Sequence, residues 1–266
     1  KNLAGTPETV GAMTHNDLRQ FHEDYYSPSN VVISAAGHLN HDALVKMVEK
    51  RLKGISAKSV EGFVEADNSQ SKPRAQFFKK DIEQMHLALG MLGLEEGHKD
   101  RYVLSVMNVI LGGNMSSRLF NEIREKRGLA YSIGSGAKAY KDTGIFLIRA
   151  GVDNHKIVQA AEVIISELRR IKRSAVTADE LRRAKDYTLG QLMLAMEETM
   201  EHMLWIGEET IAFDKIRTLK DIVAQINTVT AADVKRLASE VLNEDRFNLA
   251  VVGPITDEQQ KSLEKI

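Results

Sequence analysis

Two segments far apart in the chain share one residue pattern, and this repeat restricts the possible folds more than any other feature. Residues 14–37 and 230–253 align without gaps at a constant offset of 216. Each copy has a Thr followed three positions later by Asp, then helix-type apolar spacing, a strand-type run and a final Gly. The identical positions are Thr14/Thr230, Asp17/Asp233 and Gly37/Gly253, so a chance match is the alternative explanation. A true duplication predicts two related halves, the first of them truncated.

Helical periodicity dominates the region between the two copies. Residues 157–171 carry one apolar stripe at a period of 3.6, with Asn154 as the expected N-cap. Thr177 and Glu180 form a capping-box pattern before a stretch that is expected to stay helical to about residue 205. Another helix is expected to be capped by Asp100 and to end at the Gly-Gly pair at 112–113.

Strand patterns are fewer and lie close together. Residues 85–91 and 131–139 alternate between apolar and other side chains, and a Lys-Asp-Thr-Gly turn at 141–144 leads into an apolar run at 145–148. The last two segments are expected to form a hairpin. The sequence therefore predicts an α+β fold in which an antiparallel sheet packs against helices, built as duplicated halves.

A polar stretch divides the chain. Residues 53–73 contain few apolar residues and many Ser, Lys, Gly and acidic residues, which is typical of a linker. Residues 1–52 are then expected to be the tail of an incomplete first α+β domain, with a strand at 31–36. Residues 74–266 are expected to form a complete second domain.

Composition excludes several function classes. No apolar run approaches the roughly 18 residues of a membrane-spanning helix, so no membrane span is expected. The net charge of −1 gives no overall basic field, so nucleic acid is not an expected partner. The chain has no Cys, which excludes disulfides, thiolate metal sites and Cys nucleophiles but does not identify the compartment.

Candidate metal and phosphate sites are weak. His38 and His41 have zinc-type spacing but no nearby third ligand, and Glu198, Glu201 and His202 are expected to lie on a solvated helix face. The Gly-rich segments lack the Lys-Ser/Thr of a phosphate-binding loop or the helix that a dinucleotide fingerprint requires. No metal is therefore expected to bind this chain.

The segment LGGNMSSRLFNEIREKRGLAYSI, residues 111–133, is the most informative part of the sequence. It predicts a Gly-rich loop, a helix capped by Ser116 or Ser117, a stop at Gly128 and entry into a strand. Arg124 would lie at the helix end and Tyr131 at the strand start. An arginine and a phenol at one corner can donate hydrogen bonds to a carbonyl or an oxyanion, whereas a purely structural role is the alternative.

This segment closely resembles the pitrilysin/insulinase family of zinc peptidases, in particular its shorter members of the mitochondrial-processing-peptidase type. The resemblance extends to GTPETV from Gly5, YYSPSNVVISAAGH from Tyr25, the helix from Thr177 and FNLAVVGP from Phe247. Family members consist of homologous α+β halves, which agrees with the repeat. The family's inverted His-x-x-Glu-His zinc motif lies in the first half, and the corresponding residues 104–108 of this chain read LSVMN, without metal ligands.

The resemblance implies that the chain is the C-terminal, substrate-binding half of a zinc metalloendopeptidase that cleaves extended peptides or unfolded proteins. Zinc would be bound by the parent protein and not by this half, which alone would be inactive. The resemblance gives Arg124 and Tyr131 the role of binding the substrate near the scissile carbonyl, and it gives Gly112, Gly113 and Asn114 a substrate-handling role. It also implies a homodimer or a heterodimer with another family member. The alternative is a non-catalytic scaffold or partner subunit of the same family.

Overall fold

A computed structural model describes residues 3–55, 57–60, 62–213 and 216–265 of the chain. The chain forms two compact units, one comprising residues 1–65 and 197–214, the other comprising residues 66–196 and 215–266. We call them unit 1 and unit 2 and describe each by itself. The boundaries expected from the sequence, at 52/53 and 73/74, stay a prediction. In the described residues, no helix has the length and apolar character required to cross a membrane.

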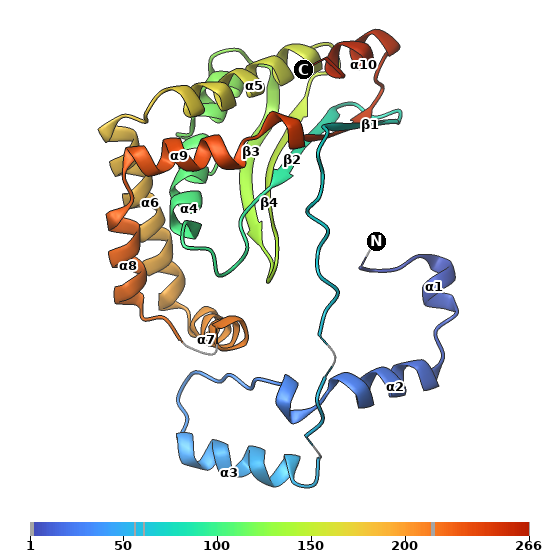
Figure 1. Ribbon diagram of the computed structural model, residues 1–266, viewed down its shortest axis with the longest axis vertical. Coiled ribbons are helices and arrows are strands. Elements are labelled where there is room, and N and C mark those ends of the chain that lie inside the picture. Colours follow the sequence, from blue (N-terminus) through green and yellow to red (C-terminus); the bar gives the residue numbers. More distant parts are fainter. Residues whose placement is uncertain (1–2, 56, 61, 214–215, 266) are drawn as a thin grey trace. The chain divides into compact units, whose positions relative to one another are not determined.

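Unit 2 contains a five-stranded sheet with the order β1-β5-β2-β4-β3 (Figure 1). Its strands are β1 (Arg74–Lys79), β2 (Met85–Leu92), β3 (Ala130–Ala139), β4 (Gly144–Val152) and β5 (Asn248–Gly253). β2 pairs antiparallel with both β4 and β5, and β3 with β4 forms the expected hairpin. β1 is the exception to the expected antiparallel arrangement, because it pairs parallel with β5. The α+β class predicted from the sequence is confirmed.

Helices cover one face of this sheet. They include α4 (Arg101–Leu111), α5 (Ile157–Arg173) and α9 (Ala231–Val241), with α6 (Ala178–Glu197), α8 (Leu219–Thr228) and α10 (Asp257–Leu263) beyond them. Short turns η2 (Phe120–Glu125) and η3 (Glu244–Arg246) complete the unit. The core lies between sheet and helices, where alternate strand residues meet the apolar helix stripes. Its fully buried members include Met85, Phe146, Ile148, Ile157, Ile164, Leu168 and Leu237.

Two of the expected helix boundaries are wrong. The helix from Ile157 has Lys156 at its N-cap position and no side-chain cap, so Asn154 does not cap it. The helix that was expected to run to about residue 205 is interrupted, because α6 ends at Glu197 and a separate α7 (Thr199–Phe213) follows. Its start is as expected, since Thr177 Oγ1 accepts from Glu180 N and the Glu180 carboxylate accepts from Thr177 N.

Unit 1 contains helices α1 (Pro7–Gly11), α2 (His15–Tyr25), α3 (His41–Leu52) and α7, with a short turn η1 (Pro28–Asn30). The strand expected at residues 31–36 is not formed. Val31 is extended, but in the described part of the chain no strand pairs with these residues, and Ser34 Oγ instead donates to Met203 O of α7 at 2.7 Å.

The repeat seen in the sequence reappears element by element. Adding 216 to the first residues of α2, η1 and α3 gives the first residues of α9, η3 and α10. Thr14 and Thr230 each cap their helix by a capping box with the Asp three residues later. Gly37 and Gly253 both have positive φ, 135° and 151°. The structure therefore supports a true duplication rather than a chance match.

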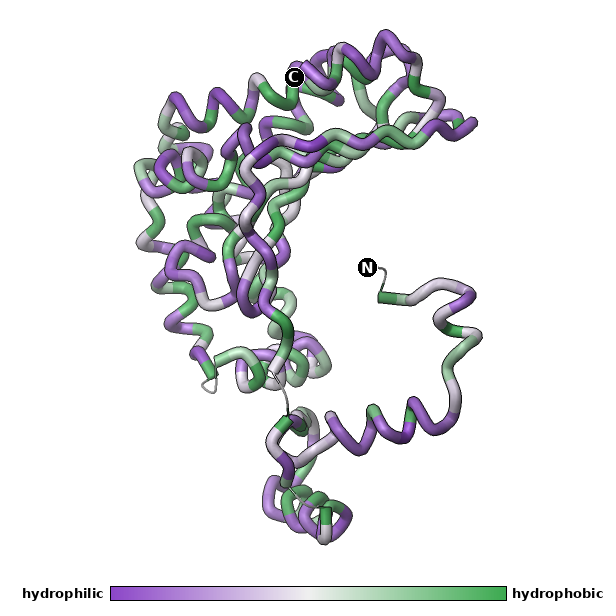
Figure 2. The backbone as a smooth tube through the Cα atoms, turned by 45° about the vertical axis from the view of Figure 1, so that its right-hand side comes forward, coloured by the Kyte–Doolittle hydropathy of each residue, from purple (hydrophilic) through white to green (hydrophobic). Residues whose placement is uncertain are grey.

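The burial of the two copies differs. Val234 and Leu237 of α9 are fully buried, whereas their equivalents Leu18 and Phe21 of α2 are 60% and 56% exposed. Hydrophobic and hydrophilic residues alternate along α2 (Figure 2). α2 therefore has the amphipathic pattern of a core helix, but its apolar positions are not buried as those of α9 are against α4 and α5.

Candidate functional site

Arg124 lies on a wide helical turn. Residues 120–125 form a π-helix, in which Lys126 N donates to Asn121 O five residues back. π-Helical turns are rare in proteins, and those that occur are often found at functional sites. Gly128 ends the segment with a φ of 56°, and Leu129 N donates to Ile123 O at 2.8 Å, as in a Schellman motif. Neither serine caps this helix in the expected way, since no side-chain cap bond is formed and Ser117 Oγ is buried without a partner.

Tyr131 occupies a second irregularity of the backbone. Ala130 pairs with Val152 and Ser132 pairs with Gly151, so Tyr131 is an extra residue in β3. Such β-bulges bend a strand and redirect a side chain, and they are over-represented next to active sites. The Tyr131 side chain is 58% exposed, although its neighbours Leu129 and Ala130 are buried.

One hollow of about 350 Å³ contains both residues. Its other lining residues are Gly128, Leu129, Ala130, Asp153 and Lys156. Lys156 Nζ donates to Gly128 O at 3.1 Å, and the Arg124 guanidinium carbon lies 5.0 Å from the Phe120 ring centroid, in cation–π range. In the described residues, no hydrogen bond engages the Arg124 guanidinium or the Tyr131 hydroxyl. Both groups are thus available as donors in a site with a net excess of cations.

Asp153 and Lys156 were not singled out by the sequence analysis. They come from the connection between β4 and α5, and only the pairing of β3 with β4 brings that connection to the helix end at Gly128. No local pattern marks these two residues. The polar turn at 153–156, with Asn154 as the expected N-cap of the following helix, points to this connection but not to the roles of these two residues.

Gly112 and Gly113 have a packing role in the structure. A Cβ on Gly112 would lie 2.6 Å from both Ser135 N and Ser135 Oγ, and a Cβ on Gly113 would lie 3.0 Å from Val109 Cα. Ser135 N donates to Gly112 O at 3.0 Å, and Ser135 Oγ donates to Asn108 Oδ1 at 2.7 Å. The two glycines therefore let the end of α4 lie directly against β3.

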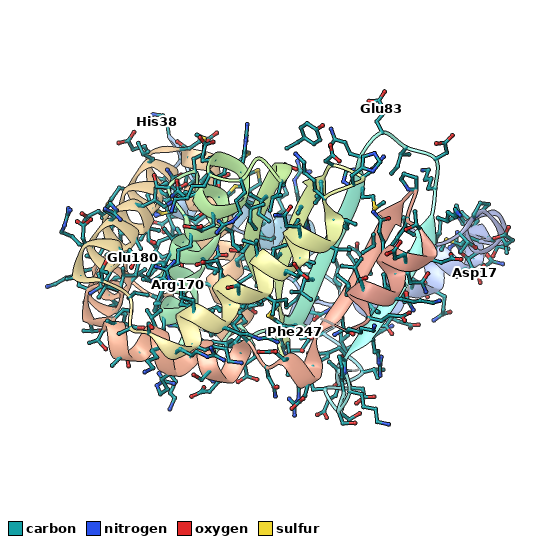
Figure 3. All side chains as sticks on the ribbon, turned by 90° about the horizontal axis from the view of Figure 1, so that it is seen from above. Asp17, His38, Glu83, Arg170, Glu180 and Phe247 are labelled. Atoms are coloured by element: carbon teal, nitrogen blue, oxygen red, sulfur yellow. The ribbon has the colours of Figure 1, made fainter. Side chains whose placement is uncertain are left out.

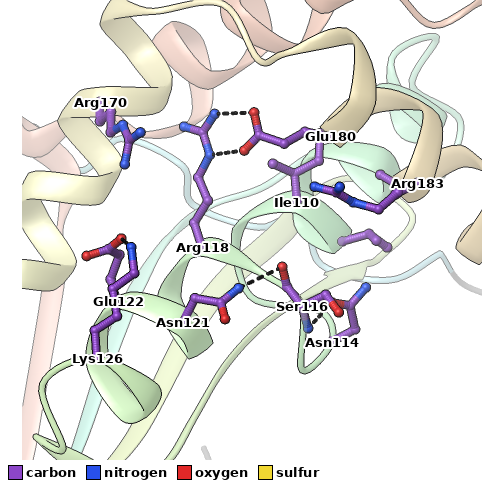
Figure 4. A pocket seen from close by; sticks show the side chains of 12 residues that line it. Ile110, Asn114, Ser116, Arg118, Asn121, Glu122, Lys126, Arg170, Glu180 and Arg183 are labelled. Atoms are coloured by element: carbon purple, nitrogen blue, oxygen red, sulfur yellow. Dashed lines mark hydrogen bonds and ion pairs between the residues drawn. The ribbon is translucent and has the colours of Figure 1, made fainter.

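Asn114 does not line the hollow that contains Arg124 and Tyr131. Its Oδ1 accepts from Ser116 N at 2.8 Å, and its side chain lines a second hollow (Figure 4), which shares no lining residue with the one at Arg124 and Tyr131. The structure brings Arg124 and Tyr131 together but does not bring Asn114 to them. A substrate role of residues 112–114 stays a prediction.

The described residues do not fit a metal site. No group of three or more His, Asp or Glu side chains is placed there to hold an ion. His38 and His41 are exposed on unit 1, and His202 lies against Trp205 with 5.7 Å between ring centroids (Figure 3 labels His38).

Comparisons with known proteins find relatives that are described as peptidases. A family model described as "Peptidase M16 inactive domain" matches residues 12–187. A relative named uncharacterized zinc protease YmxG, from Bacillus subtilis, is 38% identical over 95% of this chain and 61% of its own length. The chain thus spans about 61% of that relative.

Solved structures show the same fold. The peptidase M16 inactive domain from Pseudomonas fluorescens has a TM-score of 0.82 and 25% identity, covering 95% of this chain and 60% of that one. A chain of Complex III2 from Candida albicans, with Inz-5 bound, has a TM-score of 0.79 and 18% identity, covering 98% of this chain and 64% of that one. The family model, which matches well over half of the sequence, shows that this chain belongs to the peptidase M16 inactive domain family.

Proposed function

We propose that this chain is the substrate-binding, non-metal half of a zinc metalloendopeptidase that acts on extended peptides or unfolded proteins. The observation that carries the proposal is the hollow in which Arg124 and Tyr131 lie together, each on a backbone irregularity. Two unengaged donors can bind a peptide carbonyl and stabilise negative charge that develops on its oxygen. The metal chemistry belongs to another part of the protein, and no step of it is assigned to these residues.

The edge of the sheet supports a peptide as the ligand. β3 is an outer strand, so one side of its backbone is not paired within the sheet of unit 2. An extended peptide can add to such an edge by main-chain hydrogen bonds. Tyr131 stands at the start of this strand, so a peptide added along β3 would lead into the hollow at Arg124.

Substitutions at the two donors test the proposal in a protein that joins this chain to a zinc-binding half. Tyr131→Phe and Arg124→Ala should each lower kcat/KM by roughly 10- to 1,000-fold, the scale for losing one oxyanion donor. Zinc content should not change. Tyr140→Phe, an exposed tyrosine just beyond the other end of β3, is the matched control and should keep full activity. Full activity of Tyr131→Phe would end the assignment of that residue.

A scaffold role in an assembly of family members is the second candidate. It is favoured by the shared fold with the Complex III2 chain. A homodimer, or a heterodimer with a family member, is compatible with either role. A full-length protein that binds no zinc and hydrolyses no peptide, yet forms a stable complex with another family member, would favour the scaffold role.

A further inference from the structure

A second hollow, of about 250 Å³, lies in unit 2 between α4, the η2 segment, α5 and α6 (Figure 4). It is separate from the hollow at Arg124 and Tyr131 and shares none of its lining residues. Its charged lining residues are Arg118, Glu122, Lys126, Arg170, Glu180 and Arg183. Four cations therefore face two carboxylates.

The carboxylates are already engaged. Glu180 accepts from Arg118 Nε at 2.7 Å and from Arg118 Nη2 at 3.0 Å, and it also accepts from Thr177 N. Glu122 forms ion pairs with Lys126 and Arg127. Outside the lining, Arg170 pairs with Glu167 at 3.4 Å and Arg183 pairs with Asp179. Among the residues that line the hollow, cations outnumber carboxylates by four to two.

Arg118 has one donor group without a partner. Its side chain is only 10% exposed, and Nη1 is buried with no hydrogen-bond partner in the described residues. Figure 4 shows this third nitrogen pointing away from Glu180 and toward Arg170. A buried cationic donor that is left unpaired is costly, whereas a charge-assisted bond to an anion is among the strongest hydrogen bonds in proteins.

We propose that this hollow binds a small oxyanion, a carboxylate or phosphate group, with Arg118 Nη1 as its buried donor. Arg170 and Arg183, both largely exposed, stand at the mouth and attract the anion. Asn114 uses its carbonyl oxygen for Ser116 N, so its amide group can donate at the rim. The site goes beyond the proposed peptidase role, because it lies apart from Arg124 and Tyr131.

Anion titration tests the site in the chain itself. Inorganic phosphate and, separately, acetate are added at constant ionic strength with chloride as the replaced anion, and melting temperature and binding heat are measured. One or both anions should raise the melting temperature saturably, since a ligand that binds only the folded state stabilises it. A response to acetate alone identifies a carboxylate site, and a response to phosphate alone identifies a phosphate site. No saturable response to either overturns the proposal.

A pair of neighbouring arginines supplies the matched control. Arg182 and Arg183 both pair with Asp179, but only Arg183 lines the hollow. Arg183→Ala should weaken anion affinity by roughly threefold to tenfold, the effect expected of one exposed charge, and Arg182→Ala should leave it unchanged. Equal weakening in both variants would mean that only the general charge matters, and it would overturn the site.

Removal of the buried donor is the stricter test. Arg118→Lys keeps a cation beside Glu180 but removes the Nη1 group, so it should abolish saturable binding. If this variant does not fold, the Arg183 and Arg182 variants still decide whether the hollow binds an anion. Wild-type affinity in a folded Arg118→Lys variant would overturn the role of Nη1.

Discussion

Individual ion pairs link segments of unit 2 that are far apart in the sequence. Arg236 of α9 donates to Asp100 at the start of α4 at 2.8 Å, and Arg169 of α5 donates to Glu244 of η3 at 2.7 Å. The arginine partner is the main cause of the lowered pKa of each of these carboxyl groups. Asp100 was expected to cap α4, but its carboxylate bonds to Arg236 and makes no side-chain cap bond. Asp100, for which the sequence predicts a local capping role, thus forms a long-range ion pair instead.

Glu180 gives the clearest pH prediction. Hydrogen bonds from Arg118 lower its pKa from 4.5 to about 2. A lowered pKa in the folded state stabilises the fold above pH 4.5, and this contribution is lost as the pH falls toward 2. We expect it to amount to roughly 1–2 kcal/mol, because the pair is partly screened by solvent.

Glu180→Gln should therefore lower the free energy of unfolding at pH 7 by about this amount and should reduce its loss between pH 5 and pH 2. Asp186→Asn, which changes an exposed carboxylate on the same helix, should have an effect below about 0.5 kcal/mol. Urea unfolding across this pH range measures both. An unchanged acid slope in Glu180→Gln would contradict the prediction.

The junction of α4 with β3 depends on close backbone approach. α4 ends at Leu111, and the carbonyl of its C-cap residue Gly112 accepts from Ser135 N of the strand. Ser135 Oγ donates to Asn108 on the preceding turn of the same helix. These bonds fix where β3 lies relative to α4. The same strand carries Tyr131, so this junction also helps to position the candidate site.

Alanine at two glycines tests this junction. Gly112→Ala would place a methyl group 2.6 Å from Ser135 N, so helix or strand must shift, and we expect a loss of about 1–3 kcal/mol of stability. Gly136→Ala, one residue beyond Ser135, meets nothing within 4 Å and should change stability by less than about 0.5 kcal/mol. Thermal unfolding distinguishes them, and equal effects would show that the contact at Gly112 is not limiting.

At the scale of the whole molecule, the chain contains two copies of one helix–turn–extended–helix unit with different burial. In the second copy, α9 packs against α4 and α5 and β5 is part of the sheet, so that Leu237 and Val251 are fully buried. The equivalent Phe21 and Ala35 of the first copy are exposed. The prediction that residues 1–52 are the tail of an incomplete domain accounts for this difference, because residues 31–36 have strand-type sequence without a paired strand in the described part of the chain.

Equivalent residues of the two copies should respond differently to truncation. Leu237→Ala removes a fully buried side chain and should cost about 2–5 kcal/mol. Phe21→Ala removes a side chain that is 56% exposed and should cost less than about 0.5 kcal/mol in this chain. In a protein that completes the first half, Phe21→Ala should become as costly as Leu237→Ala. Chemical unfolding measures both, and a small effect of Phe21→Ala in that longer protein would contradict the interpretation.

The sequence by itself determined the features that rest on local bonds. The capping boxes at Thr14, Thr177 and Thr230, the apolar stripe of α5 and the hairpin turn at 141–144 close within a few residues, so their patterns are visible in the chain. The resemblance to a peptidase family selected Arg124 and Tyr131.

Only the tertiary structure decided the rest. It determines that β1 pairs parallel with β5, that residues 31–36 find no partner strand, that Tyr131 is a bulge residue and that Lys156 reaches the candidate site. It also gives Glu180 a second role, since the carboxylate that accepts from Thr177 N in the capping box of α6 also accepts from Arg118. Each of these depends on contacts between residues far apart in the chain, which leave no periodic or short-range signal in the sequence.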